Sequence, residues 1–104
     1  MHKYLSDHIH EEIDGAMDYM RKALEWKTKN PDVAMKFYKM SEMEVEHANC
    51  LTKMFNSMDK PAEVDDAEFS GMQKNIIDTY TQSMSKIEGM KKLYWEAYYG
   101  RYIW

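Results

Sequence analysis

Residues 33–58 read VAMKFYKMSEMEVEHANCLTKMFNSM, and eight positions in this stretch recur at alternating steps of four and three. Such spacing predicts a helix with one face turned toward a core. These eight positions are Val33, Phe37, Met40, Glu44, His47, Leu51, Met54 and Met58. Glu44 and His47, at the centre of this stripe, are both ionisable. Burying them costs free energy unless their charges are neutralised. Because Glu and His at i, i+3 project from one side of a helix, a metal ion could neutralise them.

A second helix is expected before this stretch. It should begin at Ser6 or Asp7 and run to about Lys27. Asn30 followed by Pro31 is typical of an N-cap and a first helical residue, so the quoted helix starts after a very short turn. The two helices therefore form an antiparallel hairpin over residues 5–58, in which the second helix carries Glu44 and His47.

A long third helix is expected over residues 65–103, where Asp65 and Glu68 resemble a capping box. Unbroken, it would be about 55 Å long. It therefore either breaks at Gly89 or reaches past its own hairpin toward another chain. Its aromatic-dense end, from residue 94 onward, is explained best by subunit packing. The apolar stripe of this helix consists of Phe69, Met72, Ile76, Tyr80, Ser83, Ile87, Met90, Tyr94 and Tyr98.

The turn geometry brings a third ligand-type residue to the pair. Glu12 lies on the apolar face of the first helix. In an antiparallel hairpin, residues equally far from the turn lie at similar heights. With the turn at Lys29 and Asn30, Glu12 should face His47 and lie within about one turn of Glu44. The sequence thus predicts two carboxylates and one imidazole at the same depth.

These residues occur in a known pattern. Residues 12–19 (EIDGAMDY) followed by residues 44–48 (EVEHA) resemble half of a ferritin-like protein of the rubrerythrin kind. That superfamily builds a di-metal centre from one Glu on each of two helices and Glu-x-x-His on each of the other two. This chain has one copy of each element, so it is most similar to the half-length encapsulated-ferritin group. The residue roles that the resemblance implies are metal ligation by Glu12, Glu44 and His47, and a catalytic position for Tyr19 beside the centre.

The resemblance implies an all-α ferritin-like four-helix bundle that is completed by dimerisation. It also implies two iron ions per dimer, with Fe(II) oxidised by dioxygen or peroxide, in a homodimer or a higher homo-oligomer. Manganese or zinc also suits such ligands. An encapsulin-type shell is a further implied partner, although residues 100–104 (GRYIW) differ from the usual docking peptide.

Composition narrows the class of protein. The 104 residues fit one domain, 1–104, and the formal net charge of -4 gives no basic surface for nucleic acid. No apolar run approaches the roughly 20 residues that span a bilayer. A single cysteine excludes an intrachain disulfide and a rubredoxin-type iron site. We therefore expect a cytoplasmic protein, enclosed in a protein compartment if it has the implied shell as a partner, with neither membrane nor nucleic acid as partner.

Several residues have two readings from sequence alone. His8, one turn before Glu12, is either an exposed first-turn histidine, which we favour, or an auxiliary ligand. His2 and His10 are expected to be solvated, and Cys50 to be buried and inert. Tyr19 is either an electron donor or hydrogen-bonding partner of the centre, or a core aromatic residue.

Two other functions fit the same residues. One is a helical assembly protein whose site holds a structural metal or none, with the third helix as its interaction surface. The other is a manganese-dependent enzyme that disproportionates peroxide. Redox activity separates the first of these from an iron oxidase, because a structural site shows no oxygen-dependent turnover.

Overall fold

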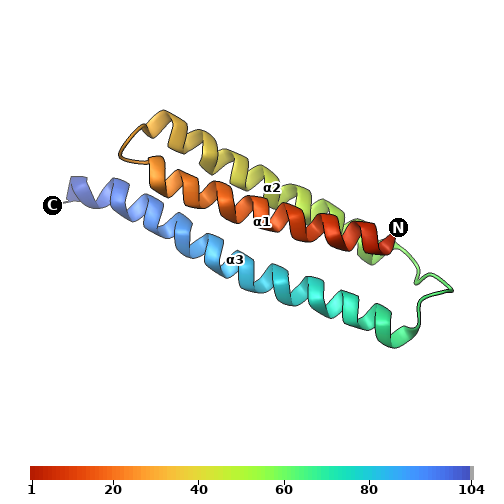
Figure 1. Cartoon of the computed structure of the whole chain (residues 1–104). Helices are drawn as coiled ribbons and strands as arrows, with labels where there is room; N and C mark the ends of the chain where they lie inside the picture. The colour runs from red at the N-terminus through yellow and green to blue at the C-terminus, as the bar shows by residue number, and fades with distance from the viewer. Residues whose placement is uncertain (104) are drawn as a thin grey trace.

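The computed structural model describes the backbone of residues 1–103 and the side chains of residues 1–96. In this part of the chain all regular structure is helical: α1 (His2–Trp26), α2 (Pro31–Ser57) and α3 (Asp66–Ile103). Helices α1 and α2 form an antiparallel hairpin, and α3 runs along one side of it (Figure 1). The predicted all-α hairpin with a long third helix is confirmed, while its completion by a second chain stays a prediction.

The N-terminus of α1 lies earlier than the sequence suggested. The helix begins at His2, where Leu5 N donates to Met1 O at 2.9 Å, so the predicted start at Ser6 or Asp7 was wrong. Packing explains the extension, because His2 and Leu5 are 4 % and 2 % exposed. The expectation that His2 is solvated was also wrong.

The predicted caps at the two other helix starts are confirmed. Val33 N donates to Asn30 Oδ1 at 3.3 Å, and Pro31 is the first residue of α2. Glu68 N donates to Asp65 Oδ1 at 2.7 Å at the start of α3. Each side chain satisfies a backbone donor that the first helical turn leaves free.

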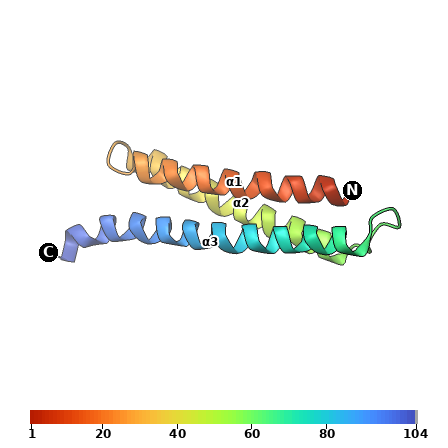
Figure 2. The same ribbon diagram turned by 60° about the horizontal axis from the view of Figure 1, so that its bottom comes forward.

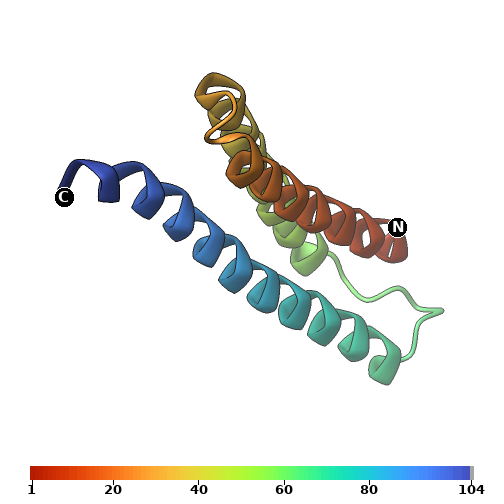
Figure 3. The same cartoon turned by 60° about the vertical axis from the view of Figure 1, so that its left-hand side comes forward.

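Helix α3 is continuous through Gly89 and extends beyond the α1–α2 turn (Figure 2). Its predicted stripe faces the hairpin, because Ile76, Ser83, Ile87 and Tyr94 are buried there. Figure 3 shows the helix alone on its side of the hairpin. The stripe is therefore used to close the core within one chain.

The aromatic end of α3 packs on its own chain as far as it is described. Trp95 Nε1 donates to Tyr38 Oη at 3.0 Å, and the Tyr38 and Tyr94 rings lie 5.0 Å apart. Tyr94 is thus buried within one chain, whereas for the partly buried Trp95 packing against a second subunit stays a prediction. The side chains of the remaining aromatic residues, from Tyr98 onward, lie outside the described part.

The predicted core stripe of α2 is displaced from the real core. Met40, Met54 and the His47 side chain are 38 %, 48 % and 56 % exposed, so this stripe is not buried in one chain. The core expectation was wrong because α1 and α3 together cover a neighbouring stripe, rotated by about 100°. The buried residues of α2 are Ala34, Tyr38, Ser41, Ala48 and Phe55.

The core consists of two apolar clusters with a polar layer at their junction. The cluster near the α1–α2 turn includes Ala16 and Tyr38, and the cluster near the N-terminus includes Ile13 and Ala48. Between them, Ser41 Oγ donates to Ala16 O at 2.6 Å in a fully buried position. The candidate site is built at this junction. None of the helices in the described range is long and apolar enough to cross a membrane.

Candidate metal centre

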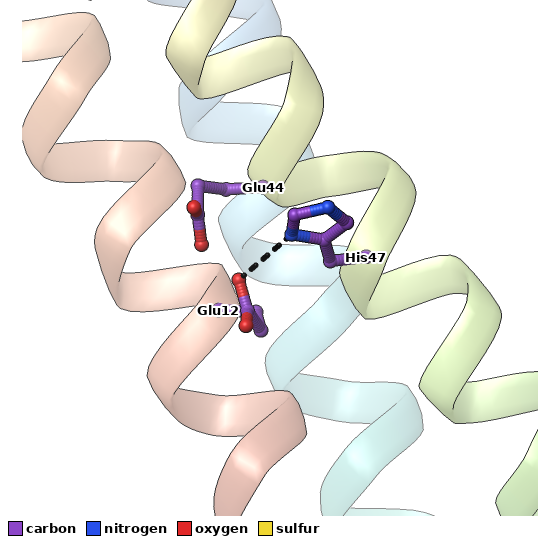
Figure 4. Close-up of side chains that lie close together, drawn as sticks. All are labelled: Glu12, Glu44 and His47. Atoms are coloured by element: carbon purple, nitrogen blue, oxygen red, sulfur yellow. Dashed lines mark ion pairs between the residues drawn. The ribbon is translucent and has the colours of Figure 1, made fainter.

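Two helices supply the three predicted ligands. Glu12 projects from α1, and Glu44 and His47 project from α2 toward it (Figure 4). One ligand atom from each residue lies within 4.8 Å of the other two. The predicted convergence of these three residues across the hairpin is therefore confirmed. Whether they can bind a metal depends on their burial, their hydrogen bonds and their charges.

The junction of the two core clusters leaves room for these polar side chains. On α1, Gly15 lies one turn after Glu12 and beneath the Glu44 side chain. A Cβ atom at Gly15 would lie 3.4 Å from Glu44 Oε2 and 3.8 Å from its Cδ. Glycine thus keeps open the space into which the Glu44 carboxyl extends.

The Glu12 carboxylate is held between two imidazoles. Its Oε1 accepts from His8 Nε2 at 3.0 Å, and its Oε2 lies 3.5 Å from His47 Nδ1. The Glu12 side chain is only 15 % exposed, and Oε2 is buried without a hydrogen-bond donor from any described residue. A buried carboxylate oxygen without a donor is costly, so this atom requires a proton or a cation.

The two carboxyl groups have opposite acidities. The close contact between the two carboxyl groups, and after it burial, raises the pKa of Glu44 to about 7. The same contact holds the pKa of Glu12 below its usual value. Two adjacent carboxyl groups cannot both ionise cheaply, so the pair retains one proton, formally on Glu44. A divalent cation between them would replace that proton and stabilise both anions.

The donor set narrows the ion that would fit. Two carboxylates and one imidazole suit iron and manganese, and zinc also accepts such ligands. Three protein ligands leave coordination positions open on a metal that takes more than three. The site also opens to solvent, because the His47 side chain is 56 % exposed. Figure 4 looks onto this open face, with α3 behind the hairpin.

The other residues discussed from the sequence have distinct positions. The Tyr19 ring stacks on Phe37 with 6.2 Å between centroids, and Lys22 Nζ lies 5.9 Å from its centre. Its catalytic role stays a prediction. Cys50 is exposed, so the expectation that it is buried was wrong.

His8 is the residue that sequence reasoning underrated. We favoured an exposed first-turn histidine, whereas it is partly buried and hydrogen-bonded to Glu12. The available signal was its i, i+4 spacing to Glu12, which places two side chains together on a helix. This spacing received little weight because the helix was expected to begin only one or two residues before His8.

Comparison with known proteins adds one match. The rubrerythrin family model matches residues 3–100, a range that contains Glu12, Glu44, His47 and nearly all of α3. No curated protein and no solved structure matches the chain. The similarity therefore extends well beyond the hairpin that carried the sequence resemblance.

Proposed function

The chain belongs to the rubrerythrin family, and from that premise we propose that it binds iron at Glu12, Glu44 and His47 and oxidises Fe(II). The observation that carries the proposal is the buried Glu12 Oε2, which faces two other ligand-type groups and accepts no hydrogen bond from any residue whose side chain is described. A structural polar cluster would be expected to satisfy that atom from within the protein. A cation would satisfy this atom and would also replace the proton that the carboxyl pair retains.

We further propose that two copies of the chain share the centre. Three ligands from one chain are half the set that ferritin-like di-metal sites use. The open side of the site is flanked on α2 by Met40 and Met54, which are 38 % and 48 % exposed. A second copy related by a two-fold axis would cover these side chains and would supply the missing ligands. Such a dimer would hold two iron ions.

The chain's own residues would have separate tasks at this centre. Bound iron would supply reversible one-electron chemistry toward dioxygen or peroxide. Glu12 and Glu44 would neutralise its charge, and Glu44 would give up its proton as the ion enters. His47, the most exposed of the three, would bind on the solvent side. Tyr19 would stand near the centre as a candidate electron donor.

An anaerobic Fe(II) titration of the metal-free protein tests the proposal. We expect tight binding to saturate at one iron per chain, accompanied by a shift from monomer to dimer in analytical ultracentrifugation. On exposure to air, the loaded protein should oxidise its iron faster than the same Fe(II) in buffer. Saturation without oxygen-dependent oxidation, or a preference for zinc, would contradict the oxidase and favour a structural metal.

Matched variants separate the site from the surface. Glu44→Gln and His47→Ala should abolish tight iron binding, because each removes a ligand, and both should keep the helical circular dichroism. Glu46→Gln is the control, since Glu46 is exposed on the same helix and is not part of the three-residue group. Unchanged iron stoichiometry in both site variants would refute the ligand assignment.

A further inference from the structure

A second imidazole contacts the candidate centre from one turn earlier on α1. His8 Nε2 lies 3.0 Å from Glu12 Oε1, and the His8 side chain is 35 % exposed. The Tyr4 ring packs edge-on against His8 with 5.7 Å between centroids. The three-residue ligand group does not include His8. Any effect of His8 on a bound metal would therefore be transmitted through Glu12.

The geometry divides the two oxygens of Glu12 between different partners. Because an ionised carboxylate only accepts hydrogen bonds, a neutral His8 must carry its proton on Nε2 to contact Oε1. That contact commits Oε1, which leaves Oε2 directed toward His47 Nδ1 at 3.5 Å. Without His8, the carboxylate could rotate about its last bond and offer either oxygen, or both.

We propose that His8 is a positioning residue, which holds Glu12 Oε1 by a hydrogen bond and so presents Oε2 alone to the metal. This inference rests on the proposed function, because it assigns the binding mode of one of its ligands. Outer partners of this kind orient ligating groups, and their removal typically lowers metal affinity about 10–100-fold. The proposed effect on this site lies in the same range.

Cobalt(II) is a suitable probe because it is stable in air and its visible absorption reports the number of ligand atoms. The experiment titrates Co²⁺ into wild type, His8→Ala and His8→Gln. Glutamine retains an N–H donor near the position of Nε2. His10→Gln is the matched control, since His10 lies two residues later and points about 160° away from Glu12 around the helix.

We expect His8→Ala to lower the Co²⁺ affinity about 10–100-fold and to change the visible spectrum, because Glu12 can then bind through both oxygens. His8→Gln should restore both the affinity and the spectrum, and His10→Gln should match wild type. Equal affinity and spectrum in wild type and His8→Ala would overturn the inference while leaving the proposed function intact.

A measurement on the metal-free protein keeps the two hypotheses apart. If wild type binds neither Co²⁺ nor Fe(II), the proposed function is wrong. Long-range ¹H–¹⁵N correlation of the histidine rings then still tests the contact itself, with neutral His8 expected as the Nε2–H tautomer. The opposite tautomer, protonated on Nδ1, would refute the hydrogen bond to Glu12 and with it the positioning role.

Discussion

Two neighbouring stripes of α2 have different fates in this protein. One, with Ala34, Ser41 and Phe55, is fully buried beneath α1 and α3. The other, with Glu44 and His47, is rotated by about 100° and remains partly open to solvent. The first stripe stabilises the chain, whereas the second places chemical groups where an ion can reach them. A single helix thus separates its core residues from its candidate ligands by one residue of register.

The largest expected effect comes from the buried stripe. Phe55 is 0 % exposed and its ring stacks on Phe69 at 5.7 Å between centroids, so Phe55→Ala should destabilise the fold by about 3–5 kcal/mol. Its neighbour Met54 is 48 % exposed, and Met54→Ala should change the free energy of unfolding by only about 0.5 kcal/mol in the monomer. Urea unfolding at low protein concentration measures both.

The same pair also tests whether the open stripe is covered by a second copy. If Met54→Ala becomes clearly more destabilising as protein concentration rises, the open stripe is an interface. If it costs as much as Phe55→Ala in a dilute monomer, the contrast between the two stripes is wrong.

A smaller effect is expected from pH. The pKa of Glu44 is raised to about 7 from an ordinary value of 4.5, so the folded metal-free chain binds more protons than the unfolded chain between these values. Stability from this group is therefore complete below about pH 4.5 and is lost as the pH rises through 7. Glu12 acts in the opposite sense, because its pKa is lowered and its contribution is lost only in acid.

Thermal unfolding of the metal-free protein between pH 5 and 8 checks this expectation. The melting temperature of wild type should fall by a few degrees relative to Glu44→Gln, which cannot ionise at this position. Glu46→Gln should follow the wild-type profile. If the melting temperatures of wild type and Glu44→Gln change with pH in the same way, the pKa of Glu44 is not raised by its contact with Glu12.

The smallest effect is expected at Gly15, where helix stability favours a larger residue but the Glu44 carboxyl needs the space. Gly15→Ala should raise helix stability by up to about 1 kcal/mol. Its Cβ would also lie 3.4 Å from Glu44 Oε2, so it should restrict that carboxyl and weaken Co²⁺ binding several-fold.

Gly71→Ala is the control, because a Cβ there meets no atom of the described residues within 4 Å. It should give the gain in stability without the loss of affinity. Chemical unfolding and Co²⁺ titration of the two variants measure both quantities. Equal Co²⁺ affinity in the two variants would show that Gly15 does not make room for Glu44.

Much of the site was predictable because its determinants are local. The i, i+3 spacing of Glu44 and His47, together with the turn marked by Asn30 and Pro31, predicted that Glu12 would meet them. Helical rise and rotation are nearly constant, so a short turn transfers the register of one helix to the next. The apolar periodicity of residues 69–94 separately predicted the stripe of α3, and the structure shows that this stripe packs on the hairpin.

The sequence by itself therefore determined three helices, the N-terminal caps of α2 and α3, and the convergence of two carboxylates with one imidazole. Only the tertiary structure decided which of two adjacent α2 stripes is buried, because that depends on where α3 packs. It also decided that α1 begins at His2, since burial of the first turn outweighs the local signals at Ser6 and Asp7. The approach of His47 to the second oxygen of Glu12 likewise follows from a contact between helices, whereas the contact of His8 with the first oxygen lies within α1 at i, i+4 spacing.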